Sequence, residues 1–229
     1  MEVLVVGNTA YVDDDFCTKA FPGDHVQVVA ADDAQRESSS HSSWKELLRH
    51  LDQAYEFDRV VYLSTYLTPH TETFGDIELL RSVFRACMGR RVQLLFVAGP
   101  AGAASNADSL DATDAAAQTG KGIIARAAND LCRYYASQDG IQAKILRTPY
   151  LYTASAALDD PFLVPLFEAC STGSVALQGA AEAPLPLLCA EELAVLVHRV
   201  FDSWDVTFET LDVADAFHRT AGDLGGALQ

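Results

Sequence analysis

The first residues of the chain that could do chemistry lie in a turn between an apolar strand and a helix. The strand covers residues 2–6, and Gly7 follows it directly. Ala10 is small and stands three positions later, a spacing that lets a helix N-terminus approach a phosphate group. The third position of this spacing is Asp13, which opens a run of three aspartates. A carboxylate there suits the helix dipole but repels a phosphate. The sequence therefore predicts the architecture of a nucleotide-binding turn without its usual chemistry.

The elements that must position this turn alternate between strands and helices along the first 150 residues. Continuous apolar runs predict buried parallel strands at residues 2–6, 25–30, 59–64, 92–98 and 142–146. Helical spacing of apolar residues predicts helices at 13–20, 44–55, 76–89 and 121–137. Strands separated by helices form βαβ units. We therefore predict a Rossmann-like α/β fold with a doubly wound parallel sheet.

Beyond residue 150 the alternation gives way to shorter segments. The sequence predicts short elements at 161–170, 175–177 and 185–189, an amphipathic helix at 190–202 and a last strand at 208–213. No long linker precedes them. We predict one domain over residues 1–229, with a sheet core at 1–150 and a smaller C-terminal lobe at 151–229.

Composition excludes several classes of partner. The chain has 229 residues, 49% of them hydrophobic, and a net charge of −16 from 16 basic and 32 acidic residues. Nucleic acid is excluded as a partner, because phosphate contacts need clustered Lys and Arg, and an anionic membrane surface repels such a protein. No apolar run reaches the ~18 residues that cross a bilayer, and no signal peptide is evident. We expect an acidic cytoplasmic protein whose five cysteines are free thiols.

Metal and nucleophile motifs are missing from the sequence. The six histidines show neither H-x-x-x-H nor H-E-x-x-H spacing, so we expect no metal site. No G-x-S-x-G elbow supports a serine nucleophile. Cys17 follows the aspartate run, whose charge raises a thiol pKa, so it is a poor nucleophile. Ser64 ends the strand at 59–64 and His70 follows it. Ser64 either lines a pocket or simply terminates the strand, and His70 is either a site residue or a surface loop histidine.

Three segments together resemble one family, the extended short-chain dehydrogenases/reductases of the NAD-dependent epimerase/dehydratase type. Residues 7–13 resemble its Gly-x-x-Gly-x-x-Gly turn. Residues 146–152, Leu-Arg-Thr-Pro-Tyr-Leu-Tyr, resemble its L-R-P-x-x-x-Y segment, and residues 187–194 resemble the entry to its C-terminal helix. The resemblance spans nearly the whole chain and implies a Rossmann-like fold.

The catalytic residues that the resemblance implies are missing. That family uses a Tyr with a Lys four residues later on a helix, where the charge of the Lys lowers the pKa of the Tyr. Residues 127–131 resemble a turn of that helix, which aligns Lys121 with the Tyr and Ala125 with the Lys. No Tyr occurs between Tyr66 and Tyr134, so no alignment creates the pair. Lys121 is left as a weak catalytic candidate.

The resemblance also implies which residues would bind NAD or NADP. They are Gly7, Thr9 and Ala10 in the first turn and Asp32, which stands where the family places the acid that binds the adenosine ribose. Asp32 is otherwise a loop carboxylate of an acidic protein. We expect no cofactor, because Asp13 disrupts this site; the alternative is a turn that moves Asp13 aside and still binds a dinucleotide.

Three functions remain open from the sequence. The first is a non-catalytic member of the family that acts as an interaction, regulatory or scaffolding domain. The second is an NAD(P)-binding sensor, and the third is an NAD(P)-dependent oxidoreductase or epimerase with an atypical active site. Because dimers of the family pair through two helices, the resemblance implies a homodimer or a protein partner at residues 76–89 and 121–137.

Overall fold

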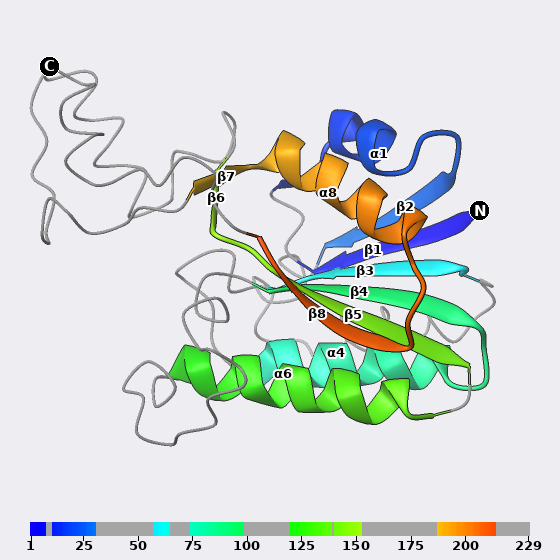
Figure 1. The fold of residues 1–229 in the computed structure, drawn as a ribbon, viewed down its shortest axis with the longest axis vertical. Coiled ribbons are helices and arrows are strands. Elements are labelled where there is room, and N and C mark those ends of the chain that lie inside the picture. Colours follow the sequence, from blue (N-terminus) through cyan, green and yellow to red (C-terminus); the bar gives the residue numbers. More distant parts are fainter. Residues whose placement is uncertain are drawn as a thin grey trace, which may run out of the picture.

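Six parallel strands form one sheet, in the order β2-β1-β3-β4-β5-β8. The structure is a computed structural model and describes residues 1–7, 11–30, 57–64, 74–98, 120–138, 140–152 and 187–213. The strands of this sheet are β1 (Glu2–Gly7), β2 (His25–Ala30), β3 (Arg59–Leu63), β4 (Val92–Ala98), β5 (Ile141–Arg147) and β8 (Phe208–Asp212). The prediction of a Rossmann-like α/β fold is confirmed (Figure 1).

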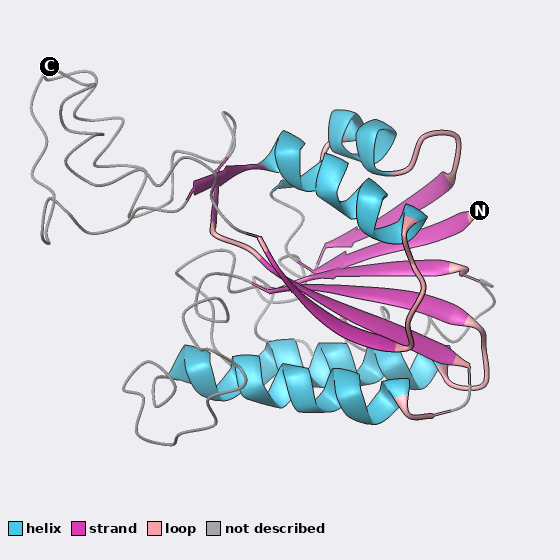
Figure 2. Cartoon of the chain, viewed as in Figure 1, coloured by secondary structure: helices cyan, strands magenta, loops and turns pink. Residues whose placement is uncertain are grey.

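Two pairs of helices cover the two faces of the sheet (Figure 2). Helices α4 (Phe74–Cys87) and α6 (Gly120–Ala136) contact each other on one face. Helices α1 (Asp14–Ala20) and α8 (Ala190–Asp202) contact each other on the opposite face. The sheet therefore lies between two helical layers, which we call the α4/α6 layer and the α1/α8 layer.

Strand alternation divides the core between these two layers. On β1, Leu4 and Val6 pack in the cluster under α4 and α6, whereas Val3 and Val5 pack in the cluster under α1 and α8. All four side chains are buried. Because successive side chains of a strand point to opposite faces, a strand covered on both sides needs apolar residues at every position. This explains the continuous apolar runs of the sequence.

The outer strand β8 is held to β5 by ion pairs between directly opposed residues. Lys144 faces Glu209 in the strand register, with Nζ 2.8 Å from a carboxylate oxygen. Arg147 faces Asp212 in the same way at 2.6 Å. The Lys144 side chain is buried against the ring of Trp204, so its charge is held by Glu209 and not by bulk water. These pairs fix the register of β8 on the sheet.

Residues beyond position 150 therefore contribute to the sheet core that was expected within 1–150. Both β8 and α8 belong to that core, as partners of β5 and of α1. A second, two-stranded sheet pairs β6 (Tyr150–Tyr152) with β7 (Leu187–Cys189) in parallel. The division into a core and a smaller lobe stays a prediction, because residues 153–186 and 214–229 lie outside the described residues.

The remaining predicted elements agree in type with the structure where it describes them. Strand and helix ends differ by at most two residues, as in α4, which was expected at 76–89 and covers Phe74–Cys87. The predicted elements at 44–55, 161–170 and 175–177 lie outside the described residues. Among the helices that the structure describes, none combines the length and apolar character needed to cross a membrane.

Candidate functional site

The strand order reverses direction at β1, which has β2 on one side and β3 on the other. In open α/β sheets, ligands bind outside the carboxyl ends of the strands at such a reversal. The carboxyl ends here are Gly7 of β1 and Leu63 of β3, which are directly paired in the register. This edge of the sheet, together with the N-terminus of α1, is the candidate site.

Gly7 is required by the close approach of the two strand ends. Its φ of +115° lies in a region that side chains rarely adopt, and an added Cβ would lie 1.9 Å from the backbone oxygen of Leu63. The backbone of β3 therefore dictates a glycine at this position. The role of Gly7 in binding a cofactor stays a prediction, since packing alone explains the residue.

Asp13 caps the N-terminus of α1. Its backbone is extended, and its Oδ1 accepts a hydrogen bond of 2.8 Å from the backbone N–H of Phe16, three residues later. Asp14 and Asp15 follow in the first turn of the helix. Aspartate at this position satisfies a backbone donor that the helix leaves unpaired, which explains why the helix begins where it does.

These residues do not fit the pyrophosphate of a dinucleotide. A phosphate at a helix N-terminus takes its hydrogen bonds from the first free N–H groups and its attraction from the dipole. Here the N–H of Phe16 already donates to the carboxylate of Asp13. A phosphate would also approach the charges of Asp14 and Asp15 within the same turn. We therefore derive no catalytic step through NAD or NADP for this chain.

The other predicted cofactor residues, Thr9, Ala10 and Asp32, lie outside the described residues. Lys121 is the second residue of α6, and its side chain is likewise outside the description. The structure thus places Gly7 at the end of β1 and Asp13 at the start of α1. The roles of Thr9, Ala10, Asp32 and Lys121 stay predictions.

Polar side chains at the carboxyl edge hold strand ends together. The buried hydroxyl of Thr148 donates to the backbone oxygen of Ala98 at 2.9 Å, and the N–H of Thr148 donates to the same oxygen at 3.0 Å. The N–H of Ser64, whose side chain is also buried, donates to the backbone oxygen of Val97. The sequence analysis missed this role of Thr148, because its acceptor lies 50 positions away and no local pattern contains the bond.

Cys17 is a poor nucleophile, as predicted, but mainly for a different reason. Burial makes the largest contribution to raising the pKa of its thiol, and the charges of Asp14 and Asp13 add to it. Among the described residues, no three His, Cys, Asp or Glu side chains gather as metal ligands. A shallow depression lined by Leu4, Phe57 and Arg90 lies at the opposite, amino edge of the sheet, away from the candidate site.

Comparison with known proteins identifies relatives by fold. No family model matches the chain, and no curated protein matches it by sequence. Among solved structures, ADP-L-glycero-D-manno-heptose-6-epimerase of Helicobacter pylori matches with a TM-score of 0.73 and 9% identity, over 99% of this chain and 81% of that one. The Bordetella bronchiseptica enzyme WbmF in complex with NAD+ and UDP matches with a TM-score of 0.71 and 13% identity, over 99% and 76%.

A third solved structure extends the comparison to an NADP complex. The GDP-L-fucose synthetase of Naegleria fowleri bound to NADP matches with a TM-score of 0.70 and 10% identity, over 98% of this chain and 81% of that one. At these identities the likeness shows a shared fold. The fold expected from the resemblance to extended short-chain dehydrogenases/reductases is therefore confirmed.

Proposed function

We propose that this chain is a non-catalytic member of the extended short-chain dehydrogenase/reductase family, which acts as an interaction, regulatory or scaffolding domain. The fold shared with WbmF in complex with NAD+ and UDP and with ADP-L-glycero-D-manno-heptose-6-epimerase supports the family. The observation that carries the loss of function is the hydrogen bond from the N–H of Phe16 to the carboxylate of Asp13. It places a negative charge where a cofactor phosphate would need to lie.

The absence of the family's catalytic pair is a second and independent observation that supports the same proposal. The sequence has no Tyr between positions 66 and 134, so the Tyr-x-x-x-Lys pair of the family is absent from the helix that would carry it. In that pair the Tyr is the general acid and base and the charge of the Lys lowers its pKa, and Lys121 alone cannot supply both roles. A fold can persist without its original chemistry, because the core and the site place separate demands on the sequence.

The alternative is a chain that still binds a dinucleotide, either as an NAD(P) sensor or as an oxidoreductase or epimerase with an atypical active site. Its support is the fold shared with WbmF in complex with NAD+ and UDP and with the fucose synthetase bound to NADP. The retained Gly7 is compatible with this alternative but does not favour it, since the backbone of Leu63 already requires a glycine.

Partner binding in the proposed role involves the α4/α6 layer. Both helices pack on the sheet through one side and leave charged side chains such as Arg81 and Arg133 exposed on the other. A protein partner or a second copy of the chain would therefore meet a charged surface.

Calorimetric titration with NAD+, NADH, NADP+ and NADPH tests the proposed function. We expect no binding heat at about 1 mM nucleotide, which corresponds to an interaction weaker than about −4 kcal/mol. Binding by the wild-type chain at micromolar concentration would overturn the proposal and favour the sensor or the enzyme.

Two variants show whether the charge of Asp13 is what prevents nucleotide binding. Asp13→Asn keeps a capping side chain and removes the charge, whereas Asp13→Gly removes both the side chain and the charge. We expect both variants to bind at least about tenfold more tightly than the wild type, a difference of about 1.4 kcal/mol. No gain in either variant would show that the turn itself, and not the charge of Asp13, prevents binding.

A further inference from the structure

The outer side of the α4/α6 layer carries charged side chains that have no ion-pair partner among the described residues. Glu78, Arg81 and Arg85 on α4 are exposed, as is Asp130 on α6. None of these four side chains belongs to an ion pair within the part of the chain that the structure describes. Their charges are therefore available to a binding partner.

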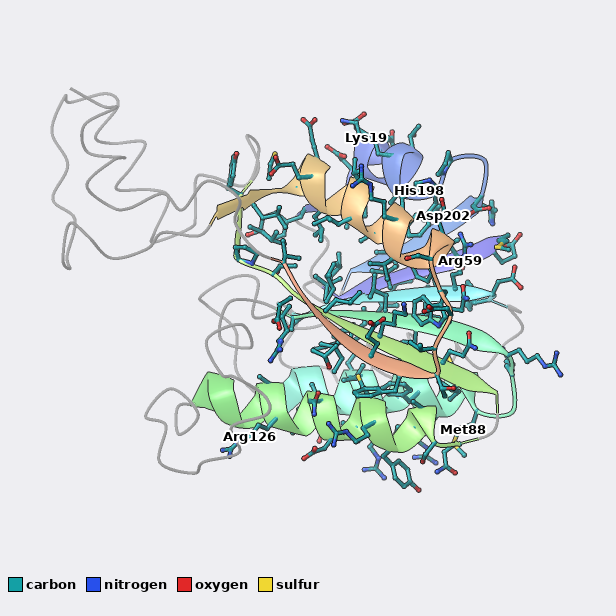
Figure 3. The ribbon with its side chains drawn as sticks, viewed as in Figure 1. Lys19, Arg59, Met88, Arg126, His198 and Asp202 are labelled. Carbon is teal, nitrogen blue, oxygen red and sulfur yellow. The ribbon has the colours of Figure 1, made fainter. Side chains whose placement is uncertain are left out.

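Two exposed acids of the α1/α8 layer differ, because they are already paired within the chain. Glu191 lies 2.9 Å from Lys19, and Asp202 lies 3.2 Å from His198. Figure 3 shows Lys19, His198 and Asp202 on the side of the sheet opposite to Met88 of α4. The α4/α6 layer is thus the better candidate for a contact that depends on charge.

The outer line of α4 has an acid at one end and a base at the other. Glu78 and Arg85 are seven positions apart, which places them on one helix face, about two turns and ~10 Å apart along the axis. Leu80 and Phe84 lie on the other side of the helix and are fully buried against the sheet. When such a line is turned end for end, its acid meets the base of an identical line.

The register of α6 beside α4 follows from one aromatic contact. Both helices connect neighbouring parallel strands, so they run in the same direction. Phe84 of α4 stacks on Tyr135 of α6 with 4.7 Å between the ring centroids, so these two residues are roughly level. Six positions earlier on each helix stand Glu78 and Asn129, which directly precedes Asp130. The acids of the two helices are therefore nearly level with each other.

A two-fold axis parallel to the helices would bring like charges together. It places α4 of one copy on α6 of the second copy, with both helices pointing the same way. Glu78 would then face Asp130 of the second copy. Arg81, which is level with residue 132, would lie beside Arg133 of the second copy. Opposed like charges disfavour this orientation.

A two-fold axis across the helices brings opposite charges together instead. It places α4 antiparallel on α4 of the second copy, and Glu78 of each copy faces Arg85 of the other, which gives two ion pairs. The axis passes between Arg81 and Ser82, the midpoint of this line. Asp130 of each copy lies within about one helical turn of the same level, so carboxylates accompany the Arg81 side chains near the axis.

Two large exposed side chains lie on the same layer. Met88 retains 50% of its surface and Tyr134 retains 59%. Tyr134 directly precedes Tyr135, which is level with Phe84, so it lies within about one helical turn of the axis. Methionine, tyrosine and arginine are enriched at protein interfaces. An antiparallel contact therefore adds apolar burial to the two ion pairs.

We propose that a second copy of the chain binds the α4/α6 layer in this antiparallel orientation, with Glu78 of each copy paired to Arg85 of the other. The family resemblance implies a contact through these two helices, but neither its orientation nor the residues that select it. This inference rests on the proposed function in using the α4/α6 layer as the contact surface. Its test needs no nucleotide, so a chain that binds NAD could still form this dimer, and a monomeric chain could still lack a cofactor.

Sedimentation velocity of the whole chain without nucleotide tests the contact. At about 0.15 M salt we expect a dimer that dissociates on dilution. Arg85→Glu and Glu78→Arg each oppose two pairs of like charges across the axis and should weaken the dimer at least tenfold. A monomer at every concentration up to about 0.1 mM, or a dimer that neither reversal weakens, would overturn the inference.

Restored complementarity identifies the orientation. The double variant Glu78→Arg/Arg85→Glu exchanges the two charges, so its copies again pair acid with base, and its dimer should be within about threefold of the wild type. An equimolar mixture of the two single variants should form a heterodimer, because each acid then meets an arginine. If the double variant stays as weak as the single variants, the two positions do not face each other and the inference is wrong.

Two matched controls separate this contact from general effects of charge. Arg85→Lys keeps the charge and should leave the dimer within a few-fold of the wild type. Arg199→Glu reverses an exposed arginine on α8, outside the proposed contact, and should leave association unchanged. Thermal unfolding confirms that each variant is folded. A loss in Arg199→Glu as large as that in Arg85→Glu would show that net charge controls association, and would overturn the inference.

Discussion

The α4/α6 layer and the α1/α8 layer have the same role in packing on their inner sides, whereas the residues on their outer sides differ. Both bury apolar side chains against the sheet, as Leu80 of α4 and Leu193 of α8 show, each with no exposed surface. Their charged outward residues are mainly arginine in the first layer and mainly aspartate and glutamate in the second. The fold requires apolar residues on the inner sides, because both faces of a parallel sheet must be covered. It does not determine the residues of the outer sides, which can contact partners.

The prediction with the largest expected effect tests whether the inner sides of the two layers contribute equally to stability. Leu80→Ala and Leu193→Ala each remove a fully buried side chain from one of the two core clusters. We expect each to lower the free energy of unfolding by about 2–5 kcal/mol, measured by urea denaturation. Val195→Ala is the matched control on the outer side of α8 and should change stability by less than about 0.5 kcal/mol. A cost below ~1 kcal/mol for one leucine would show that its layer is loosely packed.

Alkaline pH should distinguish the two layers, because the buried thiols among the described residues, Cys87 and Cys132, lie in only one of them. Burial raises the pKa of Cys87 on α4 from about 9 to about 12, and burial also raises the pKa of Cys132 on α6. A buried thiol stays protonated in the folded protein at a pH at which the same thiol ionises in the unfolded chain. This difference stabilises the unfolded chain relative to the folded protein. Above pH ~9 each buried thiol should therefore lower the free energy of unfolding by about 1.4 kcal/mol per pH unit.

Denaturant titrations at several values between about pH 8 and 10.5 measure this slope. The variant Cys87→Ala/Cys132→Ala should have a shallower slope than the wild type over this interval. Cys17 on α1 is only partly buried and its thiol pKa is also raised, so Cys17→Ala should change the slope in the same direction but by less. An unchanged slope in the double variant would assign the alkaline loss to other groups.

The smallest expected effect concerns the capping of α1. Asp13→Ala removes the acceptor of the Phe16 N–H and should lower the free energy of unfolding by about 1 kcal/mol. Asp13→Asn retains an acceptor and should cost only a few tenths of a kcal/mol. Thermal or urea denaturation of both variants measures the difference. Equal stability of the alanine variant and the wild type would show that the cap contributes nothing to the fold.

The sheet could be predicted from the sequence because each of its strands is covered on both faces or bounded by clear turns. The run at 92–98 was predicted with the bounds that β4 has in the structure, Val92–Ala98. The strand β6, Tyr150–Tyr152, was missed, because three residues are too few to show a period. Its partner β7 was predicted only as part of a longer apolar segment.

The site was predictable in one respect and not in others. The run of acidic residues at Asp13 signals a helix cap from the sequence alone, and the structure confirms the cap. The need for a glycine at position 7 arises from the backbone of Leu63, a contact between residues 56 positions apart that no local pattern contains. The division of charge between the layers was also invisible, because residues of one sign become neighbours only after folding.

The position of β8 at the edge of the sheet has a consequence for how the chain folds during synthesis. β5 ends at Arg147, but its outer partner is made only when the ribosome reaches residues 208–212. Until then β5 presents a row of unpaired backbone groups, and Lys144 has no Glu209 to neutralise it. An open edge of this kind is the point at which nascent chains pair with one another. A charge on an edge strand disfavours such pairing, so we expect Lys144, which later fixes the register of β8, to disfavour pairing between nascent chains as well.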